Sequence, residues 1–171
     1  MMDNVREIVH SIFYYHKFPF DNNFVLNLAK QKEKSFIVKN AIAALKHLKS
    51  KEIREFAIEQ INHSKNTLDF LPILISNYKK GDFKLLVNIA KKARNEYKIE
   101  QLADVFVEIY RNNKTKECGE PLEILYSKMN CAIHRKEVIE ILIKNNVLSD
   151  KIHSEIQYDC NLETRELYEK Y

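Results

Sequence analysis

The chain has 171 residues, of which 45% are hydrophobic, so it is long and apolar enough to fold around a core and is not a disordered chain. It holds only 2 Gly and 3 Pro, the residues on which hairpin turns and phosphate loops depend, which predicts an all-α protein. The net charge is +4, and the longest apolar run (70–75) is far below the roughly 20 residues that cross a bilayer, so no membrane span is predicted.

Apolar residues recur at helical spacing along almost the whole chain. The predicted helices cover about 3–16, 23–32, 35–48, 51–62, 68–79, 83–94, 97–112, 120–129, 132–145, 150–158 and 162–170. The breaks between them are short and polar. Ser50, Asp82, Ser149 and Asn161 each stand directly before an apolar run, where their side chains would accept bonds from the first free N–H groups of a helix.

Taken in pairs, these helices form five hairpins and one final helix. The second members of the pairs start near residues 23, 51, 83, 120 and 150. A recurring unit of this size is typical of a helical-repeat array, although its period is not fixed. An ordinary helical bundle is the alternative architecture.

Two helix starts far apart in the chain have a common pattern: SKEIREFA at 50–57 and NLETRELY at 161–168. Each is a capping residue, two variable positions, a β-branched residue and an arginine, Arg54 or Arg165. This pattern resembles the second-helix start of HEAT-like repeats of the armadillo/HEAT superfamily. The segment from Leu122 to Tyr168, with NCAIHR, NNVLSD and YDCN, is similar to the terminal repeats of bacterial HEAT-repeat proteins.

The resemblance implies a short right-handed α-α superhelix, a HEAT-like solenoid in which residues 1–171 form a single domain. Arg54 and Arg165 lie one turn into their helices, where the helix dipole does not favour positive charge, so we expect another group to hold them. The resemblance implies that this group is a carboxylate or carbonyl of the neighbouring repeat. Direct contact with a ligand is the alternative.

Basic residues are concentrated in the middle of the chain. Residues 30–98 contain 16 Lys or Arg against 7 Asp or Glu, whereas residues 99–171 contain 10 against 14. If stacked repeats align equivalent positions, these cations form a positive strip. The candidate binding residues are Lys46, Lys49, Lys79, Lys80, Lys84, Lys91, Lys92 and Arg94. A lysine-rich surface that only keeps the protein soluble is the alternative interpretation.

The three cysteines are an odd number in a chain without an apolar signal segment at its start, which predicts a cytoplasmic protein with reduced thiols. Together with His134, which follows Cys131 at short ligand spacing, Cys118, Cys131 and Cys160 could bind zinc. We interpret them instead as small buried core residues, so no metal and no cofactor are predicted.

Two further clusters have structural interpretations. The aromatic residues between Tyr14 and Phe20 are expected to close the end of the array rather than to stack on bases. Asp104 and Glu108 lie four residues apart and are expected to belong to a solvated face. No catalytic motif is recognisable, so no catalytic residue is assigned.

These observations favour a non-catalytic interaction or scaffold module that binds a protein or another acidic partner through one face of a helical-repeat array. The alternative is a nucleic-acid-binding protein, for example one resembling the bacterial HEAT-like alkylpurine DNA glycosylases. Against that alternative, the chain has no Trp, and no segment matches those enzymes residue by residue.

Overall fold

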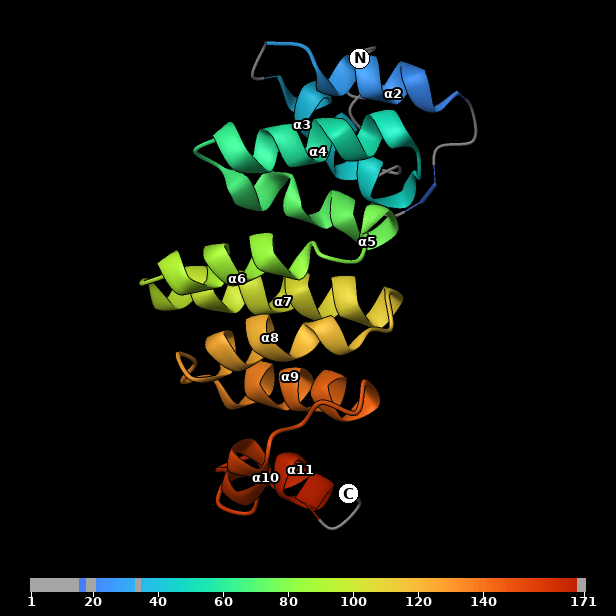
Figure 1. Ribbon diagram of the computed structural model, residues 1–171. Helices are drawn as coiled ribbons and strands as arrows, with labels where there is room; N and C mark the ends of the chain where they lie inside the picture. The colour runs from blue at the N-terminus through green and yellow to red at the C-terminus, as the bar shows by residue number, and fades with distance from the viewer. Residues whose placement is uncertain (1–15, 18–20, 33–34, 169–171) are drawn as a thin grey trace. The chain divides into compact units, whose positions relative to one another are not determined.

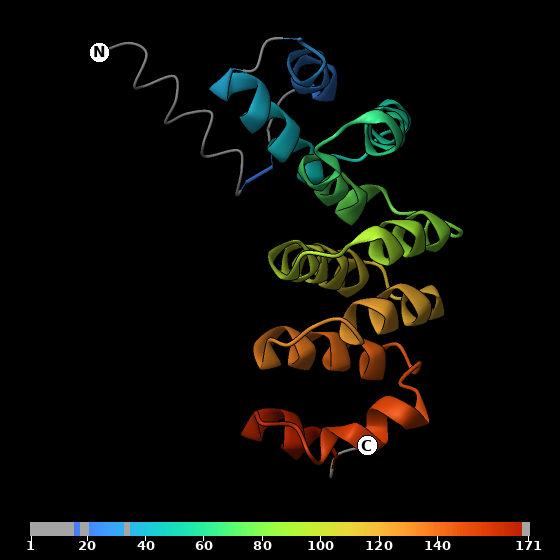
Figure 2. The same cartoon turned by 90° about the vertical axis from the view of Figure 1, so that its left-hand side faces the viewer.

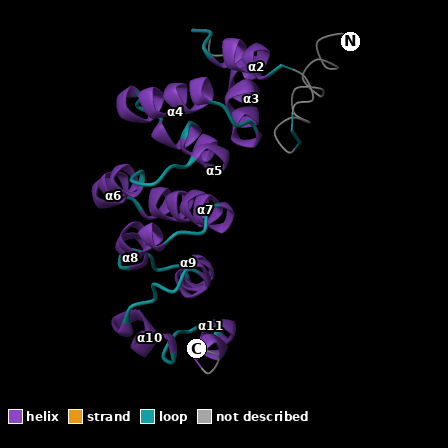
Figure 3. Ribbon diagram, turned by 45° about the vertical axis from the view of Figure 1, so that its right-hand side comes forward, coloured by secondary structure: helices purple, strands orange, loops and turns teal. Residues whose placement is uncertain are grey.

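The computed structural model describes residues 16–17, 21–32 and 35–168, which form α-helices, short 3-10 turns and loops without a strand (Figure 1). Figure 3 shows purple helices joined by teal loops over the same residues. The prediction of an all-α protein is confirmed. The chain divides into two compact units, residues 1–78 and 79–171, and each is described by itself. A single domain over 1–171 stays a prediction.

The first unit consists of short helices and 3-10 turns. They are α2 (Asn22–Ala29), α3 (Phe36–Ala44), η1 (Leu45–His47), α4 (Lys51–His63), η2 (Thr67–Asp69), η3 (Leu71–Ile73) and α5 (Leu74–Asn77). Helix α2 packs against α3, and α4 packs against η3 and α5. The core lies between these elements, where Leu45, Leu48, Ile53 and Leu71 are fully buried.

Helix α4 begins as the sequence predicts. The Ser50 hydroxyl accepts a hydrogen bond from the backbone N–H of Ile53 at 3.1 Å, which satisfies one of the free donors at the helix start. From there Ile53, Phe56, Ala57 and Ile61 form one buried face. The Phe56 ring meets the ring of Phe70 edge to face, with the centroids 5.8 Å apart.

The second unit is built from helices in two layers. They are α6 (Phe83–Lys92), α7 (Glu96–Asn112), α8 (Gly119–Tyr126), α9 (Ala132–Lys144), α10 (Asp150–Ile156) and α11 (Leu162–Tyr168), with the 3-10 turn η4 (Lys116–Cys118) before α8. Helix α6 packs on α8, α7 packs on α9, and α9 in turn packs on α11 (Figure 2). Phe106 and Tyr110 of α7 are fully buried at the centre of this unit.

Two turns of the second unit depend on a positive φ. Gly81, with φ +98°, allows the tight turn that leads into α6. Asn146, with φ 56°, ends α9, and the N–H groups of Asn146 and Val147 donate to the carbonyls of Ile143 (2.9 Å) and Leu142 (3.0 Å). This is the Schellman arrangement, which satisfies two carbonyls that the end of a helix leaves free.

The structure differs from the predicted elements at several places. The helix predicted over 68–79 is split into η2, η3 and the four-residue α5, because Pro72 has no N–H to donate within this segment. Asp82 and Ser149 stand at helix starts, but their side chains make no capping bond there. The predictions for 3–15 and for the aromatic side chains of Tyr14, Tyr15, Phe18 and Phe20 lie outside the described residues.

In the described part of the chain, no helix combines the length and the apolar composition needed to cross a membrane. This agrees with the sequence-based prediction for the apolar run at 70–75.

Candidate functional site

A buried asparagine ties together the two ends of the hairpin formed by α4 and α5. Asn77 is the last residue of α5 and is 4% exposed. Its amide nitrogen donates to the carbonyls of Leu48 (2.8 Å) and Ile73 (2.9 Å), and its amide oxygen accepts from the N–H of Ser50 (3.3 Å). One side chain therefore satisfies backbone groups at the end of α5 and at the start of α4.

The second unit repeats this arrangement at Asn145, the C-cap of α9. Its amide nitrogen donates to the Ile141 carbonyl (2.9 Å), and its amide oxygen accepts from the N–H of Thr115 (2.8 Å), just before η4. The bonded residues are 27 apart in the first unit and 30 apart in the second. Asn113 also donates to the carbonyl four residues before it, that of Ile109 (2.8 Å). The same helix-end device thus recurs along the chain.

These asparagines were not predicted from the sequence, although the chain carries a signal for them. The segments ILISN at 73–77 and ILIKN at 141–145 differ at one position, and IYRNN at 109–113 shares their first and last residues. In all three, isoleucine is the residue whose carbonyl accepts the bond from the asparagine.

Both arginines of the recurring helix start donate to backbone carbonyls. Arg54 Nη1 donates to the carbonyl of Asn77 at 2.7 Å, and Arg165 Nη1 donates to that of Asp159 at 2.6 Å. A third arginine occupies the same place in its helix: Arg135 follows the N-cap Cys131 by four residues, as Arg54 follows Ser50. The structure therefore adds Arg135 to the pair seen in the sequence.

Arg135 holds a buried carboxylate. Its Nε and Nη2 atoms lie 3.0 and 2.9 Å from Asp159 Oδ2, and the Asp159 side chain is 4% exposed. Arg135 Nη1 also donates to the Asn130 carbonyl at 3.1 Å. Because Arg165 of α11 holds the backbone of the same aspartate, the turn between α10 and α11 is held by two guanidinium groups, one from α9 and one from α11.

The predicted cationic residues fall into two groups. Lys46 and Lys49 belong to the first unit, where Lys49 is exposed and Lys46 is half-buried. The other six, all exposed, lie in or beside α6: Lys79, Lys80, Lys84, Lys91, Lys92 and Arg94. We call these six residues the α6 cationic face.

Helix α6 separates its apolar and charged residues sharply. Leu86, Val87 and Ala90 are buried, whereas Lys84, Asn88, Lys91 and Lys92 are exposed at helical spacing. The one acidic residue in 79–94, Asp82, is buried to 9% exposure, and its carboxylate accepts from the N–H of Lys79 at 2.7 Å.

Carboxylates of η4 and of the first turn of α8 neutralise only part of this charge. Lys91 pairs with Glu120 at 3.4 Å, and among the six cations in the described chain it alone has a side-chain ion pair. Glu117 accepts two bonds from the N–H of Gly81, at 2.9 and 3.1 Å. The net charge that α6 and the turn before it present to solvent is therefore positive.

Lys128 adds to the same region, and sequence reasoning did not single it out. Its ammonium group donates to the carbonyls of Ala90 (2.7 Å), Lys91 (3.0 Å) and Ala93 (3.1 Å), so it caps the C-terminal end of α6. Desolvation lowers the pKa of Lys128, and the neighbouring charge of Arg94 lowers it further.

A groove of about 810 Å³ is lined by residues of α8 and α10 and by Lys91 of α6. Ile124 and Tyr126 of α8 and Ile152 of α10 supply its apolar lining, and Tyr158 beside it is 81% exposed. Burial, followed by the charge of Glu155, raises the pKa of Tyr126 to about 12, so its hydroxyl stays protonated. The groove combines exposed aromatic surface with charged residues of both signs.

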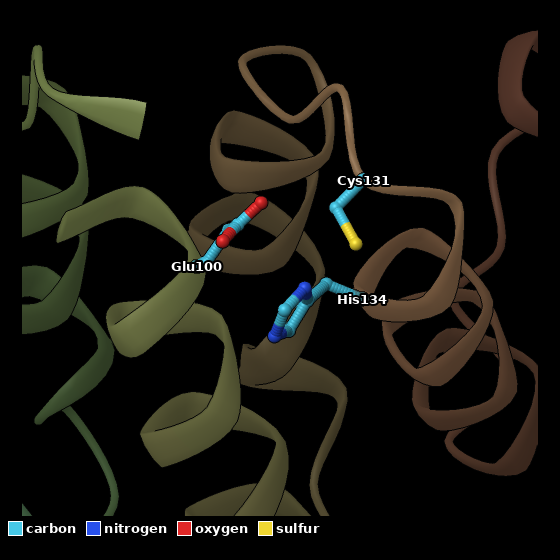
Figure 4. Close-up of side chains that lie close together, drawn as sticks. All are labelled: Glu100, Cys131 and His134. Carbon is cyan, nitrogen blue, oxygen red and sulfur yellow. The ribbon is translucent and has the colours of Figure 1, made fainter. Parts of the chain in front are cut away.

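The structure does not bring the three cysteines together. Cys118 is buried in the core, and desolvation raises the pKa of its thiol to about 12. Cys160 is exposed and accepts a long contact from Arg135 Nη2 at 3.7 Å. The four-residue zinc set considered from the sequence is therefore not formed. Cys131 and His134 do lie together, and Glu100 of α7 joins them (Figure 4).

In this cluster the side chains influence one another strongly. Backbone N–H groups at the start of α9, that of His134 above all, and then the imidazole itself, lower the pKa of the Cys131 thiol. Burial lowers the pKa of His134, but the neighbouring Cys131 and the carboxylates of Asp104 and Glu100 outweigh it, so the pKa is raised. Asp104, expected to be merely solvated, lies 3.2 Å from His134 Nε2.

Comparisons of the chain with known protein families, with curated proteins and with solved structures find no match. The assignment of a function therefore depends on the geometry of the chain itself.

Proposed function

We propose that the chain is a non-catalytic interaction module with a HEAT-like helical-repeat architecture, and that it binds an acidic segment of a partner protein. The observation that carries the proposal is the α6 cationic face, in which six exposed cations are offset by a single side-chain ion pair.

The recurring helix-end bonds support the repeat architecture. Asn77 and Asn145 each join the end of one helix to the start of the helix before it, with nearly equal separations in the sequence. Neighbouring units of a repeat protein are expected to reuse one such device, because each unit has the same ends to satisfy. The packing of α6 on α8 and of α7 on α9 agrees with a two-layer array.

The chemistry of the surface favours an acidic protein segment as the partner. Lysine and arginine on an ordered helix attract a carboxylate-rich chain at a distance and orient it. The groove lined in part by Lys91 offers apolar and tyrosine surface beside charged residues of both signs, and apolar and aromatic surface supplies anchor sites at protein interfaces.

Nucleic acid is the alternative partner that the same charges would attract. Single-stranded nucleic acid is normally held by aromatic side chains interleaved with cations. The exposed positions of α6 are Lys84, Asn88, Lys91 and Lys92, which include no aromatic residue. A duplex would be bound through its phosphates alone, with strong dependence on salt.

Fluorescence anisotropy with two probes tests the proposal. A labelled polyglutamate peptide and a labelled duplex of random sequence are titrated with the full chain at low and at near-physiological salt. We expect the peptide to bind more tightly, with an affinity that falls as salt is added. Tighter binding of the duplex would favour the nucleic-acid alternative, and the absence of binding to either probe at low salt would overturn the proposal.

A further inference from the structure

We propose that Glu100, Cys131 and His134 form a binding site for Zn²⁺ that links α7 to α9 in the second unit. A carboxylate oxygen of Glu100, the sulfur of Cys131 and a ring nitrogen of His134 lie within 4.8 Å of one another. In Figure 4 these three side chains point toward a common space between the two helices.

The spacing of the three atoms suits a tetrahedral metal site. Zinc binds sulfur at about 2.3 Å and nitrogen or oxygen at about 2.0–2.2 Å, so two of its ligands lie roughly 3.3–3.8 Å apart. Small rotations of partly exposed side chains are enough to close the remaining distance. All three residues belong to helices α7 and α9 or to the N-cap of α9, and these helices pack against each other.

The imidazole is held in the orientation that a metal ligand needs. Its Nε2 atom lies 3.2 Å from the Asp104 carboxylate, which fixes the proton on that nitrogen. The Nδ1 atom is then left with its lone pair. It is buried, and it has no hydrogen bond of normal geometry to the described residues, although Cys131 lies beside it. A metal ion would satisfy this buried nitrogen better than the weak donor of the neighbouring Cys131 thiol does.

The donor set selects the kind of metal. A thiolate and an imidazole are poor ligands for Mg²⁺ and Ca²⁺, which prefer oxygen, and good ligands for zinc. Three protein ligands leave one tetrahedral position for a water molecule or for a group from a partner.

Cobalt substitution tests this site in the full chain. The protein is purified with a chelator, kept reduced and titrated with Co²⁺, which reports a thiolate ligand through a charge-transfer absorption in the near ultraviolet. We expect one equivalent of Co²⁺ to produce this absorption and Zn²⁺ to displace it. Cys131→Ser should abolish the absorption and weaken Zn²⁺ binding at least tenfold. Asp104→Asn should keep the absorption and weaken binding about tenfold, since Asp104 acts only through His134.

Cys160→Ser is the matched control, because Cys160 is a free cysteine of the same unit outside the cluster. It should bind Co²⁺ as the unmodified chain does, and circular dichroism should show unchanged helix content in every variant. Absence of stoichiometric binding by the unmodified chain would overturn the proposal. So would an absorption that survives Cys131→Ser or disappears in Cys160→Ser.

Discussion

The polar residues at the helix ends and the cations of the α6 cationic face differ in how deeply they are buried and in whether they have partners within the fold. Asn77, Asn145 and Asp159 are each less than 10% exposed, and every one has defined hydrogen-bond partners. Lys84 and Lys92 are exposed, and nothing in the described chain pairs with their side chains. The first group stabilises the fold, and the second is available to a partner.

This contrast makes the two groups separable by mutation. A buried amide or carboxylate that loses its partner leaves an unsatisfied group, which is unfavourable by several times the net value of one exposed ion pair. Changes at helix ends should therefore lower the free energy of unfolding, whereas changes on α6 should alter binding and leave stability almost unchanged.

The largest expected effect is that of Arg135→Ala. It removes the cationic partner of the buried Asp159 carboxylate and leaves only the N–H of Asn161 among the bonds described for it, so we expect the free energy of unfolding to fall by about 3 kcal/mol in urea denaturation. The matched control is Arg111→Ala, since Arg111 is 44% exposed and pairs with Glu108 at the surface. Arg111→Ala should lower the free energy of unfolding by about 0.5 kcal/mol or less. Equal losses in the two variants would contradict the structural role of Arg135.

Asn145→Ala should have the second-largest effect and lower the free energy of unfolding by about 2 kcal/mol. The N–H of Thr115 and the carbonyl of Ile141 would both lose their bond to the buried amide. Asn112→Ala is the control, because Asn112 is exposed and donates only to the Glu108 carbonyl in its own helix. Urea denaturation measures the stability of both variants. If the Asn145 variant is as stable as the control, the hydrogen bonds of Asn145 do not stabilise the fold.

Cys118 gives a smaller effect that depends on pH. Burial raises the pKa of its thiol from 9.0 to about 12, so the folded chain keeps it neutral where the unfolded chain ionises it. This stabilisation is complete below pH 9 and is lost as the pH rises from 9 towards 12, by at most about 1.4 kcal/mol per pH unit.

Unfolding free energies of the reduced protein measured between about pH 8.5 and 10.5 test this. We expect a shallower decline for Cys118→Ala than for the unmodified chain, because other alkaline titrations are common to both. Parallel curves for the two proteins would show that the thiol is not buried in the neutral form.

The smallest change in stability is expected on the α6 cationic face. Lys84→Glu and Lys92→Glu alter exposed side chains that have no partner among the described residues, so the free energy of unfolding should change by no more than about 0.5 kcal/mol. A loss above 1 kcal/mol would show that these lysines contribute to the fold, and the contrast between the two groups would fail.

Much of this fold could be predicted from local sequence. Apolar periodicity and capping residues predict α4 and α6 to α11 to within a few residues, and Ser50 caps α4 as expected. These features depend on residues that are only a few positions apart in the chain. The exposure of the α6 lysines follows from the same periodicity.

The clusters formed by distant residues could not be predicted in this way. Glu100 and Asp104 meet His134 only because α7 packs on α9, and no local pattern states which helices pack together. The same holds for Lys128, whose role depends on the carbonyls at the end of α6. The hydrogen bonds of Asn77 and Asn145 are an intermediate case. The sequence shows that ILISN recurs as ILIKN, but it does not show which backbone groups the two asparagines bind.

The central claim is that partners bind at the α6 cationic face, and one affinity ratio tests it most directly. Lys84→Glu with Lys92→Glu is compared with Lys114→Glu with Lys144→Glu, a pair of exposed lysines outside α6 that changes the net charge equally. We predict that the α6 double variant loses at least tenfold in affinity for the polyglutamate peptide, about 1.4 kcal/mol, and that the control loses less than about threefold. Equal losses would show that net charge alone drives binding and would contradict the account.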